Sequence, residues 1–160
     1  MRQAAHTRSW ETAETILFTA LFLGLLLGYF LPLPLSRWVP RAASVVSGIA
    51  LLALSFSLIG RTRRQFRETH QPTDPGQPTT QLITTGIFSW SRNPLYLAGV
   101  ILYLGLGLLF NSLWLVLLTI PAIVAFHFIL IAPEERYLEA KFGEDYRLYK
   151  RSARRWMGRG

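Results

Sequence analysis

Three long stretches without Asp, Glu, Lys or Arg constrain this chain more than any other feature of its sequence. They cover residues 15–31, 42–60 and 94–131. A helix needs roughly 20 apolar residues to cross the hydrocarbon core of a bilayer, with a range of about 17–25. The first two stretches each suit one crossing, and the third is long enough for two. The sequence therefore predicts an all-α integral membrane protein with about four transmembrane helices. The predicted crossings are residues 15–31, 42–60, 94–110 and 113–132.

The length of the chain and its connecting segments predict a single membrane domain. The chain has 160 residues, which is the size of one domain. We expect residues 61–93 to form a cytosolic loop and residues 133–160 to form a cytosolic helix and tail. The sequence Gly105-Leu106-Gly107 lies inside an apolar stretch and follows no strand, so it does not indicate a Rossmann domain. Its glycines either let two helices pack closely or let a cofactor approach the backbone.

The basic residues are distributed unevenly, and their distribution predicts the topology. The chain has a formal net charge of +8, with 17 lysines and arginines. Two of these, Arg37 and Arg41, lie between the first two predicted crossings, which leaves 15 on the other side of the membrane. The positive-inside rule then places both termini in the cytosol, and we expect a multi-pass protein of a prokaryotic inner membrane. The basic tail is expected to contact anionic membrane lipids, and the sequence predicts no nucleic-acid partner.

Local signals predict a tight hairpin from the third and fourth crossings. Pro94 suits the first turn of a helix, with Asn93 as its N-cap. The polar pair Asn111–Ser112 is the only interruption of the long apolar stretch, and it suits a tight turn. Because this turn is so short, the residues that precede one helix and follow the other must lie close together.

After the hairpin, the sequence predicts a short helix and a tail. Pro133 can end the fourth crossing and begin a new helix, since the missing N–H of proline costs nothing in a first turn. Gly143 is expected to cap the end of that helix. Residues 145–156 alternate aromatic and basic side chains, and they either lie on the membrane surface or fold back over the helix ends.

The hairpin is expected to gather polar side chains at the cytosolic face. Arg92, Asn93 and Tyr96 stand at its beginning, and Glu134 and Glu135 stand just after its end. Each residue also has a simpler structural explanation. The two glutamates can stabilise a helix N-terminus, Arg92 can anchor at lipid phosphate, and Tyr96 can belong to an aromatic belt. The convergence of these residues is what indicates a site.

The remaining polar residues give weaker signals. The chain has no cysteine, which excludes thiol catalysis, disulfides and thiolate metal sites. His127 lies inside the fourth predicted crossing, and we expect it to make an interhelical hydrogen bond. A single histidine cannot hold a metal ion alone, and the sequence predicts no metal site.

About half of the chain resembles the isoprenylcysteine carboxyl methyltransferase and phospholipid methyltransferase superfamily. The matching motifs, in order, are Pro78-Thr79-Thr80, Leu82 and Thr85-Gly86-Ile87-Phe88; Ser91-Arg92-Asn93-Pro94-Leu95-Tyr96-Leu97; Glu134-Glu135 with Leu138; and Phe142-Gly143, Tyr146, Tyr149 and Arg155-Trp156. Asn93 stands where the prenylcysteine enzymes usually have histidine, and the tail lacks the proline that usually precedes the arginine of Arg155-Trp156. The first 77 residues resemble the superfamily only as two membrane spans.

The resemblance implies transfer of a methyl group from S-adenosylmethionine to a lipophilic acceptor at the cytosolic face. The implied acceptor is a prenylcysteine carboxylate, a phospholipid amine or another lipophilic small molecule. The implied catalytic residues are Glu134, Glu135, Arg92 and Arg155. The implied cofactor-binding residues are Arg92, Asn93, Tyr96, Glu134, Glu135, Tyr146 and Tyr149.

The chemistry of these side chains suits the implied cofactor. Arg92 or Arg155 can bind a carboxylate in a bidentate manner, and Glu134 or Glu135 can accept from ribose hydroxyls or an ammonium group. Tyrosines and Trp156 can stack on adenine or face a sulfonium through a cation–π contact.

Two alternative functions remain open from the sequence. A member of the superfamily that has lost catalysis can serve as a membrane scaffold or binding module. A small transporter is the other alternative, but it should carry polar residues near the middle of the membrane, where this chain has His127 and scattered Ser, Thr and Gly.

Overall fold

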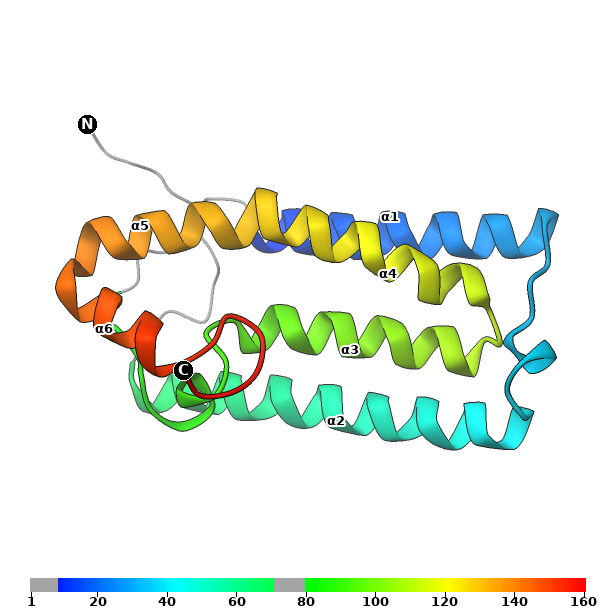
Figure 1. Cartoon of the computed structure of the whole chain (residues 1–160), viewed down its shortest axis with the longest axis horizontal. Coiled ribbons are helices and arrows are strands. Elements are labelled where there is room, and N and C mark those ends of the chain that lie inside the picture. Colours follow the sequence, from blue (N-terminus) through cyan, green and yellow to red (C-terminus); the bar gives the residue numbers. More distant parts are fainter. Residues whose placement is uncertain (1–8, 71–79) are drawn as a thin grey trace.

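The computed structural model describes residues 9–70 and 80–160 as a bundle of helices (Figure 1). Three helical rods are long and apolar enough to cross a membrane, and α3 is a shorter apolar helix. The predicted all-α membrane fold is therefore confirmed. The helices are α1 (Ser9–Phe30), α2 (Arg41–Glu68), α3 (Pro94–Leu109), α4 (Leu113–Ala125), α5 (Ala132–Phe142) and α6 (Glu144–Ser152), with short 3-10 turns η1 (Leu35–Arg37) and η2 (Gly86–Ser89) and a π-helical segment η3 (Phe126–Ile131). The basic residues Arg2 and Arg8 and the motif residues Pro78 and Thr79 lie outside the described residues.

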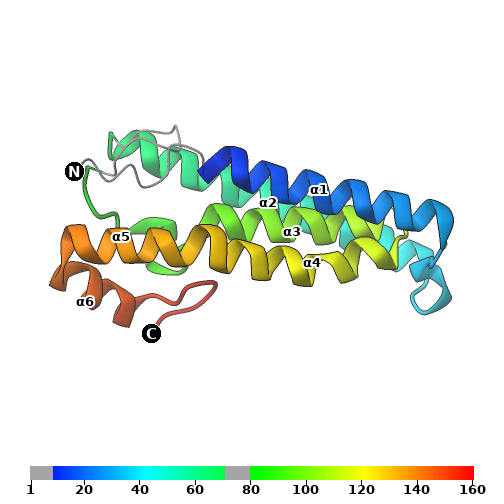
Figure 2. The ribbon, with the colours of Figure 1, turned by 90° about the horizontal axis from the view of Figure 1, so that it is seen from above.

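Small residues let α2 and α3 pack side by side over much of their length (Figures 1 and 2). A Cβ atom on Gly48 would lie 3.0 Å from the carbonyl oxygen of Gly105 and 2.9 Å from Leu109. The Ser55 hydroxyl donates to the carbonyl oxygen of Ala98 at 2.8 Å. Of the two roles open for Gly105, the structure therefore supports close helix packing.

The two connections at one end of the bundle are tied to each other. The backbone N–H of Leu35 donates to the carbonyl oxygen of Asn111 at 3.2 Å, and that of Leu113 donates to Leu33 at 3.0 Å. Asn111 has a positive φ of 54°, which a tight turn requires. Arg41 donates to the last carbonyl oxygens of α3, at Leu108 and Leu109 (3.0 and 2.7 Å). The predicted hairpin of α3 and α4 is present, and its turn is short.

The rod that contains α4 differs from the prediction that Pro133 begins a separate helix. Helical structure is continuous from Leu113 to Phe142, with the π-helical segment η3 directly before α5. The backbone N–H of Ala132 donates to the carbonyl oxygen of His127, five residues earlier, as in a π-helix. This wider turn accommodates Pro133, which has no N–H to donate and would clash in a regular α-helix.

The helix α2 also runs further than the crossing that ends at residue 60. It continues to Glu68, with an ion pair of 2.6 Å between Arg64 and Glu68 on successive turns. Such pairs stabilise exposed helices. The first residues of the predicted loop 61–93 are therefore helical.

The C-terminal segment folds back over the end of the bundle. Gly143, with a φ of 55°, ends α5 as predicted, and α6 follows at once. After α6, the carbonyl oxygen of Arg154 accepts from the N–H of Arg92 (3.0 Å), and the N–H of Gly158 donates to Trp90 (2.9 Å). Trp156 packs against the bundle core beside Leu97 and Phe126. Of the two arrangements open for the tail, the structure shows the fold-back.

Candidate active site

A buried glutamate holds two arginines where the tail covers the bundle. Glu135, near the start of α5, is only 7% exposed. Its Oε1 atom accepts from Nε of Arg155 at 3.0 Å, and its Oε2 atom accepts from Nη2 at 2.6 Å. Nη2 of Arg92 lies 3.1 Å from Oε1. Glu135 therefore joins α5, the start of α3 and the tail through one carboxylate.

Arg92 brings donors to this cluster that no described residue accepts. Its side chain is 9% exposed, and its Nε and Nη1 atoms are buried without a hydrogen-bond partner among the described residues. A buried donor left unpaired costs about 1–3 kcal/mol, and more when the group is charged. The two free donors of this guanidinium are therefore suited to an acceptor from outside the chain, such as the oxygen of a carboxylate.

The second glutamate faces a different partner. The hydroxyl of Tyr96 donates to Oε2 of Glu134 at 3.1 Å. Glu134 and Glu135 are adjacent in α5, so their side chains point about 100° apart. One carboxylate thus holds the two arginines, while the other keeps acceptor capacity beside a phenol hydroxyl.

Asn93 occupies the N-cap position of α3, but its side chain makes no capping hydrogen bond. Its Nδ2 atom instead donates to the backbone carbonyl oxygen of Arg155 at 3.1 Å. The predicted N-cap position is therefore confirmed, but the expected capping bond is absent, and the bond from Nδ2 to the tail fixes the orientation of the amide. Asn93 positions the residue whose guanidinium reaches Glu135.

His127 also belongs to this cluster, and its partner is the tail rather than another helix, so the predicted interhelical hydrogen bond is wrong. Its Nδ1 atom lies 3.1 Å from Nη1 of Arg155. Since arginine has only donors, Nδ1 is the acceptor. In a straight α-helix, His127 and Glu135 would point roughly 80° apart. The π-helical turn between them rotates each residue by a smaller angle, which brings both side chains to Arg155.

The two tyrosines of α6, Tyr146 and Tyr149, are buried between α6 and the segments that it covers. Tyr146 and Tyr149 are 1% and 5% exposed and pack with Leu82, Phe88 and Leu138. Burial raises the pKa of Tyr146, and the charge of Glu135 raises it further. The hydroxyl of Tyr149 donates to the carbonyl oxygen of Phe88 at 2.7 Å. Tyr146 is thus a neutral group close to the carboxylates, whereas the hydroxyl of Tyr149 is used within the fold.

The structure brings together most of the residues that the sequence singled out. Arg92, Asn93, Glu135 and Arg155 form one connected group, with Tyr96 and Glu134 beside it. Trp156 belongs to the core rather than to this group. The hydrogen bonds that Arg155 donates to Glu135 raise the pKa of Arg155, so this guanidinium stays charged at neutral pH. The cluster can therefore bind an anion and orient it.

These observations define a helical membrane protein with a charged site built from helix ends and a returning tail. The sequence profile of the phospholipid methyltransferase family matches residues 43–145, which is more than half of the chain. The chain belongs to this family of methyltransferases. The match includes Arg92, Glu134 and Glu135 and ends before Arg155.

Comparison with individual proteins adds one short match. A segment of 27 residues is 63% identical to an uncharacterized protein of Haemophilus influenzae. The match covers 17% of this chain, and the chain spans 43% of the length of that protein. No solved structure matches the chain significantly.

Proposed function

We propose that the protein transfers a methyl group from S-adenosylmethionine to a lipophilic acceptor at the cytosolic face of the membrane. The observation that carries this proposal is Arg92, a buried guanidinium with two donors that no described residue accepts. Membership of a methyltransferase family supports the reaction type. We also propose that the protein lies in a prokaryotic inner membrane and that both of its termini are in the cytosol.

The residues of the site fit this cofactor. One free donor of Arg92, Nε or Nη1, would bind its carboxylate, and Glu134, held by Tyr96, would accept from its ammonium group or a ribose hydroxyl. Tyr146 would line the same space as a neutral aromatic ring. S-adenosylmethionine, when bound, supplies an electrophilic methyl group on a sulfonium. Glu135 orients Arg92 and Arg155 and compensates one of their two positive charges.

The site carries out little proton chemistry in this proposal. An acceptor that arrives as an anion or a free amine needs no strong base, so catalysis rests on positioning and on exclusion of water. The tail contributes to exclusion, because Arg154 and Gly158 are bonded to the chain beside Arg92. The acceptor is a prenylcysteine carboxylate, a phospholipid amine or another lipophilic small molecule.

The test combines product identification with a change at Arg92. Purified protein is incubated with labelled S-adenosylmethionine and a native lipid extract, and the labelled product is identified. Arg92→Lys keeps the charge beside Glu135 but removes the planar donors. We expect it to weaken binding of S-adenosylhomocysteine roughly 10- to 150-fold, since a hydrogen bond to a charged group contributes about 1.5–3 kcal/mol. Arg136→Lys, at an exposed position of α5, is the matched control.

The outcomes separate the proposal from its alternative. Unchanged affinity in a folded Arg92→Lys protein would return Arg92 to the role of an anchor at the membrane interface. Binding of S-adenosylhomocysteine without any labelled product would favour the inactive scaffold or binding module. The absence of both binding and product would overturn the proposed function.

A further inference from the structure

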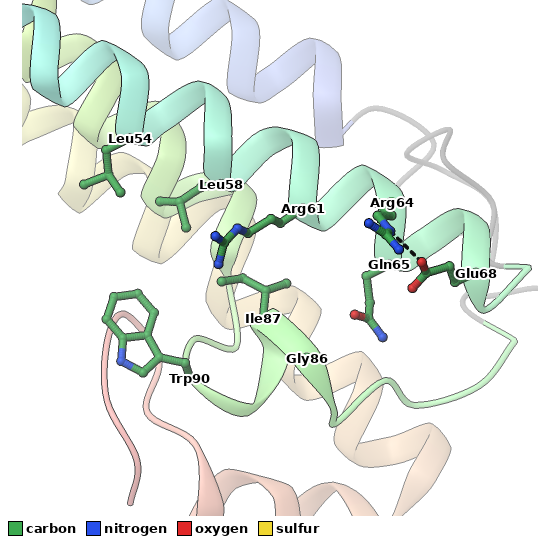
Figure 3. A pocket seen from close by; sticks show the side chains of 9 residues that line it. All are labelled: Leu54, Leu58, Arg61, Arg64, Gln65, Glu68, Gly86, Ile87 and Trp90. Atoms are coloured by element: carbon green, nitrogen blue, oxygen red, sulfur yellow. Dashed lines mark hydrogen bonds and ion pairs between the residues drawn. The ribbon is translucent and has the colours of Figure 1, made fainter.

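An open groove of about 600 Å³ lies between α2 and the segment around η2 (Figure 3). Ile87 and Trp90 form one wall, and side chains of α2 form the other. Most of the residues that α2 contributes form one stripe along the helix. They follow one another at intervals of four and three residues, so their side chains lie on the same helix face. The stripe consists of Leu54, Leu58, Arg61, Gln65 and Glu68, and Arg64 lines the groove beside it. The residues of the Arg92–Glu135 cluster are not among those that line this groove.

The chemistry of the stripe changes along its length. Leu54 and Leu58 belong to the uncharged part of α2, and Arg61 is the first charged residue after it. At 1.5 Å per residue, Leu54 lies about 10 Å from Arg61 and about 21 Å from Glu68 along the helix axis. One end of the groove therefore has the apolar character of acyl chains, and the other has the character of the headgroup region.

The polar end carries an arginine that is free to bind a ligand. Arg61 is exposed and makes no hydrogen bond or ion pair with any residue that the structure describes. In Figure 3 its guanidinium points toward Ile87 and Trp90. Arg64 is occupied by Glu68 at 2.6 Å, which neutralises the one carboxylate of the groove. With two arginines and one glutamate among its lining residues, the groove has a net charge of +1.

The shape of the groove also depends on Gly86. Its φ is 61°, and a side chain at this position would collide with Gln65. The amide of Gln65 reaches across to the hydroxyl of Thr85 at 3.4 Å. Gln65 and Thr85 therefore bring the two walls into contact at the polar end of the groove.

We propose that this groove binds one anionic phospholipid from the leaflet that faces the candidate active site. Its phosphate binds Arg61, and an acyl chain lies along Leu54 and Leu58. Trp90, which is 41% exposed, stands at the level between the two regions, where tryptophan is favoured in membranes. This lipid is a resident ligand beside the methyl-transfer site, and the proposal stands independently of that function.

The test counts lipids retained by the intact protein. The protein is purified from lipid nanodiscs that contain equal amounts of phosphatidylglycerol and phosphatidylcholine, and bound lipid is measured by native mass spectrometry. We expect preferential retention of phosphatidylglycerol, and a loss of about fivefold in Arg61→Gln, since one arginine near a lipid surface contributes about 1 kcal/mol. Arg61→Lys should retain most of the binding. Arg63→Gln removes the same charge from an exposed position of α2 that does not line the groove, and it should retain the lipid.

Three results would overturn the proposal. Equal losses in Arg61→Gln and Arg63→Gln would show a general effect of surface charge. Equal retention of phosphatidylcholine would remove the selectivity for an anion. Displacement of the lipid by millimolar glycerol phosphate would remove the role of the acyl chain. Circular dichroism of each variant confirms that the helices are intact.

Discussion

Glu135→Gln is the substitution that separates a buried ionic centre from an ordinary helix-end charge. The carboxylate of Glu135 makes three charge-assisted contacts, at 3.0 and 2.6 Å to Arg155 and at 3.1 Å to Arg92. Both Glu135 and Arg92 have side chains that are 9% exposed. Removal of one partner from a buried ion pair costs about 3–5 kcal/mol, because the remaining charge is left uncompensated.

The partial exposure of Arg155 sets the expected value within that range. Its side chain is 33% exposed, so water can compensate part of its charge. We therefore expect Glu135→Gln to lower the free energy of unfolding by about 3 kcal/mol, at the lower end for a buried pair. A purely helix-capping glutamate would contribute only about 0.3–1 kcal/mol. The measurement is chemical unfolding in detergent micelles, followed by circular dichroism.

The neighbouring residue provides the matched control. Glu134→Gln keeps an oxygen that can accept from the hydroxyl of Tyr96, so its cost in stability should stay below about 1 kcal/mol. The same variants are assayed for methyl transfer at a temperature where each is folded, and loss of transfer is expected in both. Equal stability losses below about 1 kcal/mol in the two variants would refute the ionic centre. Parental rates of methyl transfer in both would make the carboxylates structural only.

Three further predictions test the tail, the helix packing and the topology. Asn93→Ala removes the hydrogen bond to the carbonyl oxygen of Arg155. Residues 153–159 should then exchange their amide hydrogens about 2- to 12-fold faster, as expected for the loss of about 0.5–1.5 kcal/mol. Unchanged protection from exchange would contradict the role of Asn93 in positioning the tail. Gly105→Ala should lower the unfolding free energy by about 1–3 kcal/mol through overpacking against α2, whereas Gly60→Ala, whose Cβ meets nothing within 4 Å, should not. Because the chain has no native cysteine, cysteines introduced singly at His70 and Arg159 can be labelled selectively in oriented vesicles, and labelling from opposite faces would exclude the four-crossing topology.

The arrangement of the site was predictable wherever it depends on local geometry. The short turn at Asn111–Ser112 forces the start of α3 and the start of α5 to the same end of the bundle. Arg92 meets Glu135 and Tyr96 meets Glu134 for that reason. The apolar stretches likewise predicted the helices, because a membrane leaves few alternatives for a long uncharged segment.

The contacts of the tail could not be derived from the sequence in the same way. Arg155 reaches His127 and Glu135 only because residues 153–159 turn back over the bundle, and that path depends on backbone bonds to Trp90 and Arg92. The π-helical segment has one sequence signal, Pro133, which can equally end a helix. Such long-range contacts depend on the packed structure rather than on local propensity.

The distribution of polar groups along the bundle bears on the alternative functions. Within the described helices, the hydroxyls of Ser55 and Thr119 donate to backbone carbonyl oxygens. The hydroxyl of Tyr103 is buried without a partner, but it is a single neutral group. A transport path needs polar groups that continue across the membrane, whereas the charged residues here lie at the two ends of the bundle, and none lies in residues 15–31, 42–60 or 94–131 between them.

The choice between an enzyme and an inactive scaffold turns on Arg92. A scaffold gains nothing from a buried guanidinium with two unpaired donors, since each unsatisfied group costs about 1–3 kcal/mol. A site that binds an anion recovers that cost when the ligand arrives. Glu135 is shared between Arg92 and Arg155, so these three side chains keep one positive charge, and the free donors of Arg92 require hydrogen-bond acceptors in the plane of the guanidinium. Nε and Nη1 lie on different edges of the guanidinium, so a ligand carboxylate can accept a charge-assisted hydrogen bond from one of them, which favours a ligand with the amino-acid group of S-adenosylmethionine.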